Sequence, residues 1–482
     1  MPSDTLRKSP AAPSLERRTP ELSARLVAAL LAGKSAAAAS RLLGRGGGTS
    51  LPGMVARRVD PAVLDRLVGR CGVPVVAITG SNGKTTSARL CTALLRGEGV
   101  TVEQNSAGAN LIQGVTTLAV GSADLRGRID QGVLIAEVDE GALTVVASEL
   151  RPRILLVTDI FRDQLDRYGE MNAVAGAIDR VASALPDDAT LVLNGDDPLV
   201  AIMATERRGP RVTFGLELPE SRDRITRAAD TIRCPRCSAN LEYARIYLSH
   251  MGDYRCTNCG FARPALDVAV TALQVDGVSE TRMTLRTPAG ALTLRIPQAG
   301  VHVAYNAAAA VAICHALGIA VPHAAASVAG VRPAFGRLES IAAGGKRIIL
   351  AFSKNPTSFN TTLRTLAGAG EPRHLLVAFS NTLIDGEDFG WLWDVDLESA
   401  AGGIEHATAA GRRADEVANR LKYAGVPPSR ITVIEDRRAA LDSALAAVPP
   451  GGTLAITAGY TPTIEMREAM RRRGWVGRYW QA

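Results

Sequence analysis

The sequence predicts an α/β protein with parallel sheets, and three observations support this fold class. An apolar run over 73–78 is followed by a glycine-rich turn and a helix that begins at Lys84, which is typical of a buried strand followed by a phosphate-binding loop. Further apolar runs occupy 133–138 and 153–158, and from 347 onward such runs alternate with helical segments. Because 482 residues exceed what one hydrophobic core usually holds, we expect about two or three domains.

Composition and charge limit the classes of partner. The net charge is +7, but the basic residues are almost all arginine and are interspersed with acids along the chain. We therefore expect a mildly basic surface suited to anionic nucleotides or lipid head groups, and no nucleic-acid partner. The polar, proline-containing residues 1–20 lack the apolar core of a signal peptide, so we expect a cytoplasmic protein.

The chain divides into three parts. Residues 1–50 are expected to form a mobile tail and one amphipathic helix over about 21–43. Residues 51–330 are expected to form a central nucleotide-binding domain, and 331–482 a second, Rossmann-like domain. The apolar stretch 301–320 is alanine-rich and interrupted by polar residues, which predicts a buried helix and no transmembrane segment. We expect its two histidines, His302 and His315, to be packed rather than catalytic.

The loop after the first strand carries the strongest chemical signal. Glycines let the backbone approach a phosphate, and the free N–H groups at the helix N-terminus point toward it. Lys84 is expected to reach the outer phosphate oxygens, and the Thr85 hydroxyl can bind Mg²⁺. The expected phosphate-binding residues are Gly80, Ser81, Asn82, Gly83, Lys84, Thr85 and Thr86.

Two acids follow the next two apolar runs. Glu137 closes one predicted strand and Asp159 follows the other. In an open parallel sheet ligands bind at the carboxyl ends of the strands, so both carboxylates can reach a Mg²⁺ ion at the phosphates.

Four cysteines predict a structural zinc site. They form two Cys-x-x-Cys knuckles separated by residues 238–255, a spacing that lets four thiolates surround one tetrahedral ion. We expect a closed zinc-ribbon insert at about 228–265, held by Cys234, Cys237, Cys256 and Cys259. The remaining cysteines are expected to be small core residues.

The segment Thr-Gly-Ser-Asn-Gly-Lys-Thr-Thr at 79–86 resembles the ATP loop of the Mur ligases, which join amines to carboxylates in peptidoglycan synthesis. Segments 161–168 and 193–198 also resemble this family. The resemblance implies ATP and Mg²⁺ as cofactors. Many Mur ligases hold a second Mg²⁺ with a histidine and a modified lysine, but this chain has Gln164 at the histidine position and no lysine between 84 and 346.

The resemblance extends to residues that contact the nucleotide. In the segment 300–307 it makes Asn306 the adenine contact, and in 335–339 it places Arg337 on the ATP phosphates. Lys354 follows as a candidate contact for the nucleotide or an acyl phosphate. Ala351 stands where the family has a ribose-binding aspartate.

An acidic, tryptophan-rich stretch at 385–398, together with 411–425, is similar to one branch of this family, the ligase subunits of lipid II isoglutaminyl synthases. That resemblance implies ATP-dependent amidation of the D-glutamate α-carboxylate in the lipid II stem peptide, at the inner membrane face. It also implies a GatD-like glutaminase partner whose catalytic triad is completed by an aspartate of the ligase subunit. Asp388 and Asp394 are the two candidates, and the choice between them stays open.

The cysteines of this chain agree with a separate glutaminase, since neither Cys71 nor Cys314 lies in a nucleophile-elbow pattern. Two other functions remain possible. One is a stand-alone Mur-type ligase that adds an amino acid, as in folylpolyglutamate or cyanophycin synthesis. The other is a non-catalytic nucleotide-binding scaffold.

Overall fold

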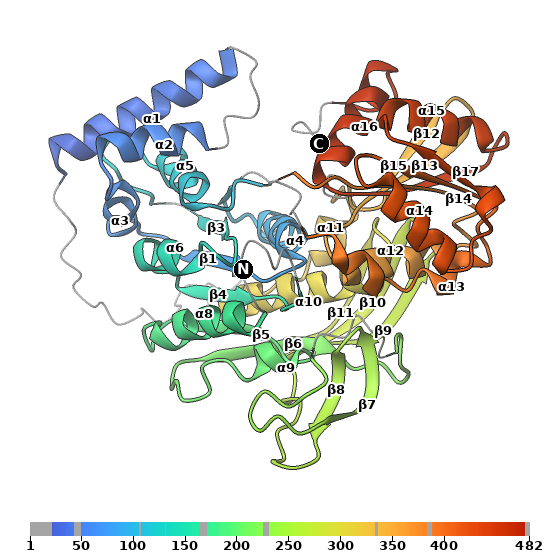
Figure 1. Cartoon of the computed structure of the whole chain (residues 1–482). Helices are drawn as coiled ribbons and strands as arrows, with labels where there is room; N and C mark the ends of the chain where they lie inside the picture. Colours follow the sequence, from blue (N-terminus) through green and yellow to red (C-terminus); the bar gives the residue numbers. More distant parts are fainter. Residues whose placement is uncertain are drawn as a thin grey trace, which may run out of the picture.

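A computed structural model describes residues 22–42, 50–105, 108–130, 132–162, 171–224, 231–332, 336–382 and 388–477. Two large sheets, each covered by helices on both faces, make up most of the molecule (Figure 1). A separate two-stranded hairpin, β7 (Leu241–Leu248) and β8 (Met251–Cys256), lies below the larger sheet in this view. Within the described part of the chain, no helix combines the length and hydropathy needed to span a bilayer.

The larger sheet has nine strands in the order β11-β10-β9-β6-β5-β4-β1-β3-β2. The strands from β2 to β9 in this order are parallel, and β10 and β11 extend them as an antiparallel edge. Their bounds are β1 (Val75–Thr79), β2 (Val102–Gln104), β3 (Val133–Glu137), β4 (Ile154–Val157), β5 (Thr190–Asn194), β6 (Arg211–Leu216), β9 (Val268–Asp276), β10 (Glu280–Thr287) and β11 (Gly290–Ile296). The predicted strands at 73–78, 133–138 and 153–158 are thus confirmed as three adjacent strands, β1, β3 and β4.

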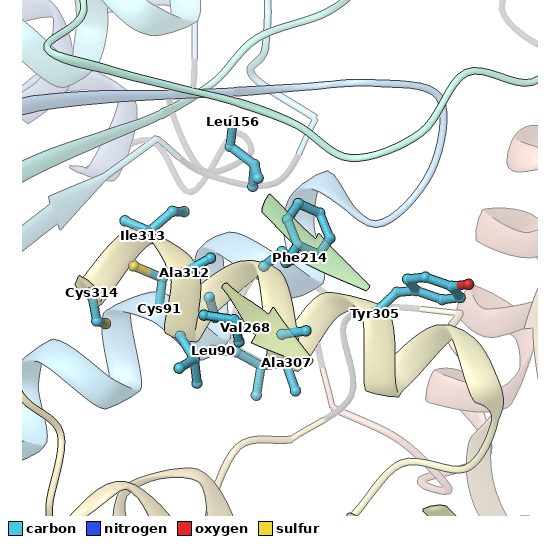
Figure 2. Close-up of a cluster of buried hydrophobic side chains, with 14 of the residues drawn as sticks. Leu90, Cys91, Leu156, Phe214, Val268, Tyr305, Ala307, Ala312, Ile313 and Cys314 are labelled. Carbon is cyan, nitrogen blue, oxygen red and sulfur yellow. The ribbon is translucent and has the colours of Figure 1, made fainter. Parts of the chain in front are cut away.

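Alternate residues of the central strands face two different cores. On β1, Val76 and Ile78 pack with the helices α4 (Lys84–Gly97), α10 (Val301–Ala316) and α11 (Ala324–Ala329). Leu90 and Cys91 of α4 meet Ile313 and Cys314 of α10 there (Figure 2). Val75 and Ala77 face the opposite core, formed by α1 (Ala24–Leu42), α2 (Leu51–Val59), α3 (Val63–Val68), α5 (Ile112–Ser122), α6 (Leu143–Leu150), α8 (Met171–Ala184) and α9 (Pro198–Ala201).

The smaller sheet has six strands in the order β12-β13-β17-β14-β15-β16, and all neighbours are parallel except β12 and β13. The strands are β12 (Glu339–Ala343), β13 (Lys346–Phe352), β14 (His374–Ala378), β15 (His406–Ala410), β16 (Ile431–Ile434) and β17 (Thr453–Ala458). One face packs against α12 (Pro356–Gly368), the 3₁₀ turn η1 (Gly390–Asp394), α13 (Glu398–Ala401) and α14 (Ala414–Tyr423). The other packs against α15 (Arg437–Ala447) and α16 (Tyr460–Arg472), and η2 (Pro428–Arg430) leads into β16.

Contacts between the two sheets hold the smaller one at the phosphate-loop side of the larger. The side chain of Asn355, which caps α12, donates from Nδ2 to the Oδ1 atom of Asn82 at 3.3 Å. Arg224 and Asp396 form an ion pair at 3.0 Å. The nucleotide loop and the start of α12 therefore face each other across the boundary.

Candidate active site

The phosphate loop has the close packing that its glycines predict. Gly80 and Gly83 have φ angles of +124° and +82°, in the region that favours glycine. A Cβ atom on Gly80 would lie 2.2 Å from Thr158 Oγ1, and one on Gly83 would lie 2.3 Å from Asn306 Oδ1. A side chain on Gly80 would also meet the backbone of Asp159, which follows β4, and one on Gly83 would have to displace the Asn306 amide.

Lys84 is buried at the start of α4 and already has an ion-pair partner. Its Nζ atom lies 3.1 Å from both carboxylate oxygens of Glu140, and it also donates to the carbonyl of Gly80. Lys84 and Glu140 each have only 7% of their surface exposed. Sequence reasoning missed Glu140, although its place three residues after Glu137 at the end of β3 gave a usable signal.

Thr85 and Glu137 come together as predicted. The Thr85 hydroxyl donates to a Glu137 carboxylate oxygen at 2.8 Å. Asn105 fixes the end of β3 by bonding both the N–H and the carbonyl of Glu137, each at 2.8 Å. Burial raises the pKa of Glu137 although Lys84 opposes this shift. A hydroxyl and a carboxylate are oxygen ligands that suit Mg²⁺, so these two side chains are compatible with that ion.

Asp159 supports the loop backbone. Its carboxylate accepts a hydrogen bond from the N–H of Asn82 at 2.7 Å, and its backbone carbonyl accepts one from the N–H of Ser81 at 2.9 Å. Burial raises its pKa to about 7. The sequence places Asp159 at the carboxyl end of β4 correctly, and the structure shows that it holds the nucleotide loop in place.

A cavity opens between the loop and the smaller sheet. Arg337 reaches it from the connection into β12, with its guanidinium 5.4 Å from the centre of the Phe352 ring. Ala351 lies in the same wall, and Lys354, just beyond, is not among the residues that line the cavity. The described lining includes Asn82, Gly83, Thr86, Phe161, Leu248, Met251, His302, Tyr305, Asn306, Arg337, Phe352 and Ser358.

The two histidines of α10 behave differently from the prediction that both are packed. His315 is exposed in the last turn of the helix, just beyond the continuously buried run 303–314. His302, at the other end, lines the cavity, where burial and the charge of Arg337 lower its pKa to about 4. Gln164 lies outside the described residues.

The four knuckle cysteines form one cluster. Their Sγ atoms all lie within 4.8 Å of one another, with Cys234 to Cys259 at 3.6 Å and Cys237 to Cys256 at 3.5 Å. A zinc ion with four thiolates at 2.3 Å needs sulfurs about 3.8 Å apart. Backbone N–H groups of Cys259 and Asn258 lower the pKa of Cys256 to about 6, whereas burial raises the pKa of Cys234. The cluster is thus compatible with a closed, tetrahedral site for one zinc ion.

The two aspartates of the tryptophan-rich stretch have different surroundings. Asp394 lies at the end of η1 and forms an ion pair at 3.1 Å with Arg162, in the segment that follows β4. Asp388 is exposed just before η1, where its Oδ1 atom accepts the N–H of Gly390 at 2.8 Å. Beside them, Trp393 is 50% and Tyr423 is 70% exposed, and their ring centres lie 5.8 Å apart.

Comparisons with known proteins agree with this geometry. Residues 78–266 match the Mur ligase middle domain, and residues 352–463 match the MurT ligase C-terminal family. The chain is 32% identical to the lipid II isoglutaminyl synthase (glutamine-hydrolyzing) subunit MurT of Streptococcus pneumoniae R6, over 92% of this chain and 96% of that protein. It is 28% identical to the corresponding subunit of Staphylococcus aureus N315, over 91% and 96%.

Solved structures show the same fold at lower identity. A pseudomurein peptide ligase type C from Methanothermus fervidus superposes with a TM-score of 0.66 and 21% identity, covering 85% of this chain and 81% of that one. MurF ligase from Thermotoga maritima, in complex with ADP, gives a TM-score of 0.60 and 14% identity, covering 87% and 85%. These likenesses confirm the predicted Mur ligase fold, and the identity to the streptococcal subunit across nearly its whole length shows that this chain belongs to the MurT family of Mur-type ligase subunits.

Proposed function

We propose that this chain is an ATP-dependent ligase subunit that amidates the D-glutamate α-carboxylate of the lipid II stem peptide. The observation that carries the proposal is that the loop with Lys84 and the Thr85–Glu137 pair borders, through Asn82, Gly83 and Thr86, a cavity that Arg337 also lines. The names of the streptococcal and staphylococcal relatives support the substrate. Because lipid II is a membrane lipid, the enzyme would work at the inner membrane face.

The chemistry requires the carboxylate oxygen to become a leaving group. A carboxylate oxygen attacks the γ-phosphorus of ATP, the bond to the ADP oxygen breaks, and an acyl phosphate forms. Ammonia then attacks the acyl carbon, phosphate leaves, and loss of a proton gives the amide. Lys84 and Arg337 would offset charge on the transferring group. Thr85 and Glu137 would hold Mg²⁺, which would neutralise phosphate charge.

Glu140 gives Lys84 an ion-pair partner for the state without bound nucleotide. In the structure its carboxylate compensates the buried ammonium, and an arriving phosphate would compete for the same N–H donors. The loop would therefore keep its lysine in place before the nucleotide binds, because a buried ammonium without a partner is costly.

The ammonia would come from a GatD-like glutaminase subunit. A glutaminase nucleophile must meet glutamine and a histidine, but Cys91 and Cys314 have no exposed surface. Cys71 donates to the carbonyl of Val73, and the knuckle cysteines lie together in their own cluster. Among the described residues, no cysteine is therefore placed for this chemistry.

Asp388 is our choice for the residue that completes the partner's triad. The Asp388 side chain is exposed, and its hydrogen bond to the N–H of Gly390 lies within its own segment. Asp394 instead faces Arg162 within this chain. An aspartate that must orient a histidine of another subunit has to be accessible to it, and this favours Asp388.

Trp393 and Tyr423 are expected to anchor the partner glutaminase. Replacing both with alanine should weaken the complex about 100-fold, because exposed aromatic pairs are typical interface hot spots. Affinity between the purified subunits measures the effect, and amidation with ammonium salt should persist. Leu125→Ala, at a 58% exposed apolar residue elsewhere, is the control. Unchanged affinity in the double variant would place the partner on another surface.

The cysteine cluster is proposed to hold one structural Zn²⁺. Metal analysis of reduced protein should find about one zinc per chain. Cys234→Ser should lose this metal and destabilise the hairpin, since a tetrahedral site with three thiolates binds zinc less tightly. Cys71→Ser is the matched control and should retain the metal. Zinc-free wild-type protein would contradict the proposal.

ATP turnover separates this function from the two other possibilities. Lipid II together with ammonia should stimulate ATP hydrolysis with no amino acid present. A stand-alone Mur-type ligase would need an amino acid instead, and a scaffold would show no stimulation at all. Stimulation only by an amino acid would overturn the amidation proposal.

A further inference from the structure

The hairpin β7–β8 has two ends with different surroundings. At the cysteine end, Leu241 and Tyr254 pack with the knuckle cysteines in a small cluster of their own. At the other end, Leu248 and Met251 belong to the core of the larger sheet, together with α4 and α10. Both of these residues also line the cavity beside the phosphate loop. The cysteine insert therefore extends from its cysteine cluster into the wall of the cavity beside the phosphate loop.

The inner end of the hairpin is fixed by buried polar contacts. The N–H of Gly252 donates to the carbonyl of Asp196 at 3.0 Å, and Asn194 Nδ2 contacts the Met251 sulfur at 3.3 Å. The Asp196 carboxylate accepts the Tyr305 hydroxyl at 2.8 Å and Arg263 Nε at 2.6 Å.

These contacts join three elements at one buried carboxylate. Arg263 lies where the insert returns to the sheet, and Tyr305 directly precedes Asn306 on α10. Asp196 itself has no exposed surface. The hairpin and the helix that carries the expected adenine contact are thus held in one fixed arrangement.

The turn of the hairpin also faces the smaller sheet. The N–H of Ser249 donates to Asp223 at 2.7 Å, and Asp223 forms an ion pair with Arg364 of α12. Residues Thr357 and Thr361 of the same helix line the cavity on its other side. The cavity is therefore bounded by the hairpin, the phosphate loop and α12.

The chemistry of this wall suits the flat face of a purine. Leu248 and Met251 present apolar and thioether surface, while Asn306 offers an amide group for the polar edge of a base. The phosphates are expected at Lys84, which directly follows the cavity-lining residues Asn82 and Gly83 in the loop. We propose that the hairpin of the cysteine insert forms the base-binding wall of the nucleotide site, with Leu248 and Met251 as residues that determine affinity for the base. This inference rests on the proposed ATP-dependent function.

Two leucines of the same strand provide a matched test. Leu248 and Leu241 are 7% and 8% exposed, but only Leu248 lines the cavity. Leu248→Ala should weaken ATP binding about tenfold, as loss of apolar contact in a pocket does, while zinc content and the affinity for inorganic triphosphate stay unchanged. Leu241→Ala should lower thermal stability with little change in ATP affinity. Calorimetry with ATP and with triphosphate measures both affinities.

Met251→Ala provides a second variant if Leu248→Ala does not fold, and Met251→Leu should restore affinity. Normal ATP affinity in both alanine variants, with zinc retained, would overturn the inference and leave the proposed function intact. An equal loss of ATP and triphosphate affinity would also overturn it, because the defect would then not concern the base. Lys84→Ala tests the proposed function separately, since normal ATP binding in that variant would contradict the use of this loop.

Discussion

Lys84→Ala is expected to lower ATP-dependent amidation about 10³-fold, even with saturating ammonium salt as the nitrogen source. The ammonium of Lys84 is the charge that the loop directs at the outer phosphates. Removal of one such group from a buried site lowers the rate by about two to three orders of magnitude. Amide formation on lipid II measures the effect. An activity within tenfold of the wild type would exclude this lysine from phosphoryl transfer.

The structure adds a control to this experiment. Lys84→Ala also leaves the buried carboxylate of Glu140 without its cation, and breaking a buried ion pair by removing one partner costs about 3–5 kcal/mol. The single variant should therefore unfold at a lower temperature. Adding Glu140→Gln should restore much of the stability, since the uncompensated charge is removed, but should not restore amidation. Recovery of activity in the double variant would show that Lys84 acts only on folding.

The sequence predicted the strand, glycine-rich loop and helix around Lys84 well because the signals for these elements are local. Residues 80–86 contain the N–H groups and the lysine that are expected to bind phosphate. Glu137 ends one strand and Asp159 follows another, and the parallel sheet brings the carboxyl ends of these strands together. The apolar runs alone were enough to predict that these strands are buried. The clustering of the four cysteines could also be predicted from the sequence, because the Cys-x-x-Cys spacing reflects the geometry around a tetrahedral ion.

Contacts between distant segments could not be predicted in this way. The pairing of Arg162 with Asp394 joins the segment after β4 to the tryptophan-rich stretch, and no pattern in either segment indicates it. The same holds for Leu248 and Met251. Their sequence pattern is that of ordinary strand residues, and only the fold shows that they line the cavity. The apolar neighbours of His315 predict a packed side chain, but this histidine is exposed because it lies at the end of α10, where the continuous burial of the helix stops.

Asp388→Asn and Asp394→Asn form a matched pair that tests which aspartate serves the glutaminase partner. Each substitution removes one negative charge and keeps nearly the same size. Asp388→Asn should reduce glutamine-dependent amidation about 10²- to 10⁴-fold, because an amide cannot stabilise the imidazolium that forms during the reaction and favours the wrong histidine tautomer. Amidation with ammonium salt should survive, since the ATP site lies elsewhere.

Asp394→Asn should behave differently, because Asp394 faces Arg162 and both side chains are about one-third exposed, at 32% and 34%. An exposed ion pair of this kind is worth about 1 kcal/mol or less, so a small loss of stability with near-normal glutaminase activity is expected. Glutaminase activity, ammonium-dependent amidation and complex formation are measured for both variants. Loss of glutaminase activity in Asp394→Asn alone would reverse our choice. Equal loss of the glutamine and ammonium reactions in Asp388→Asn would show that this stretch serves the ligase site, because a triad residue affects only the reaction that produces ammonia.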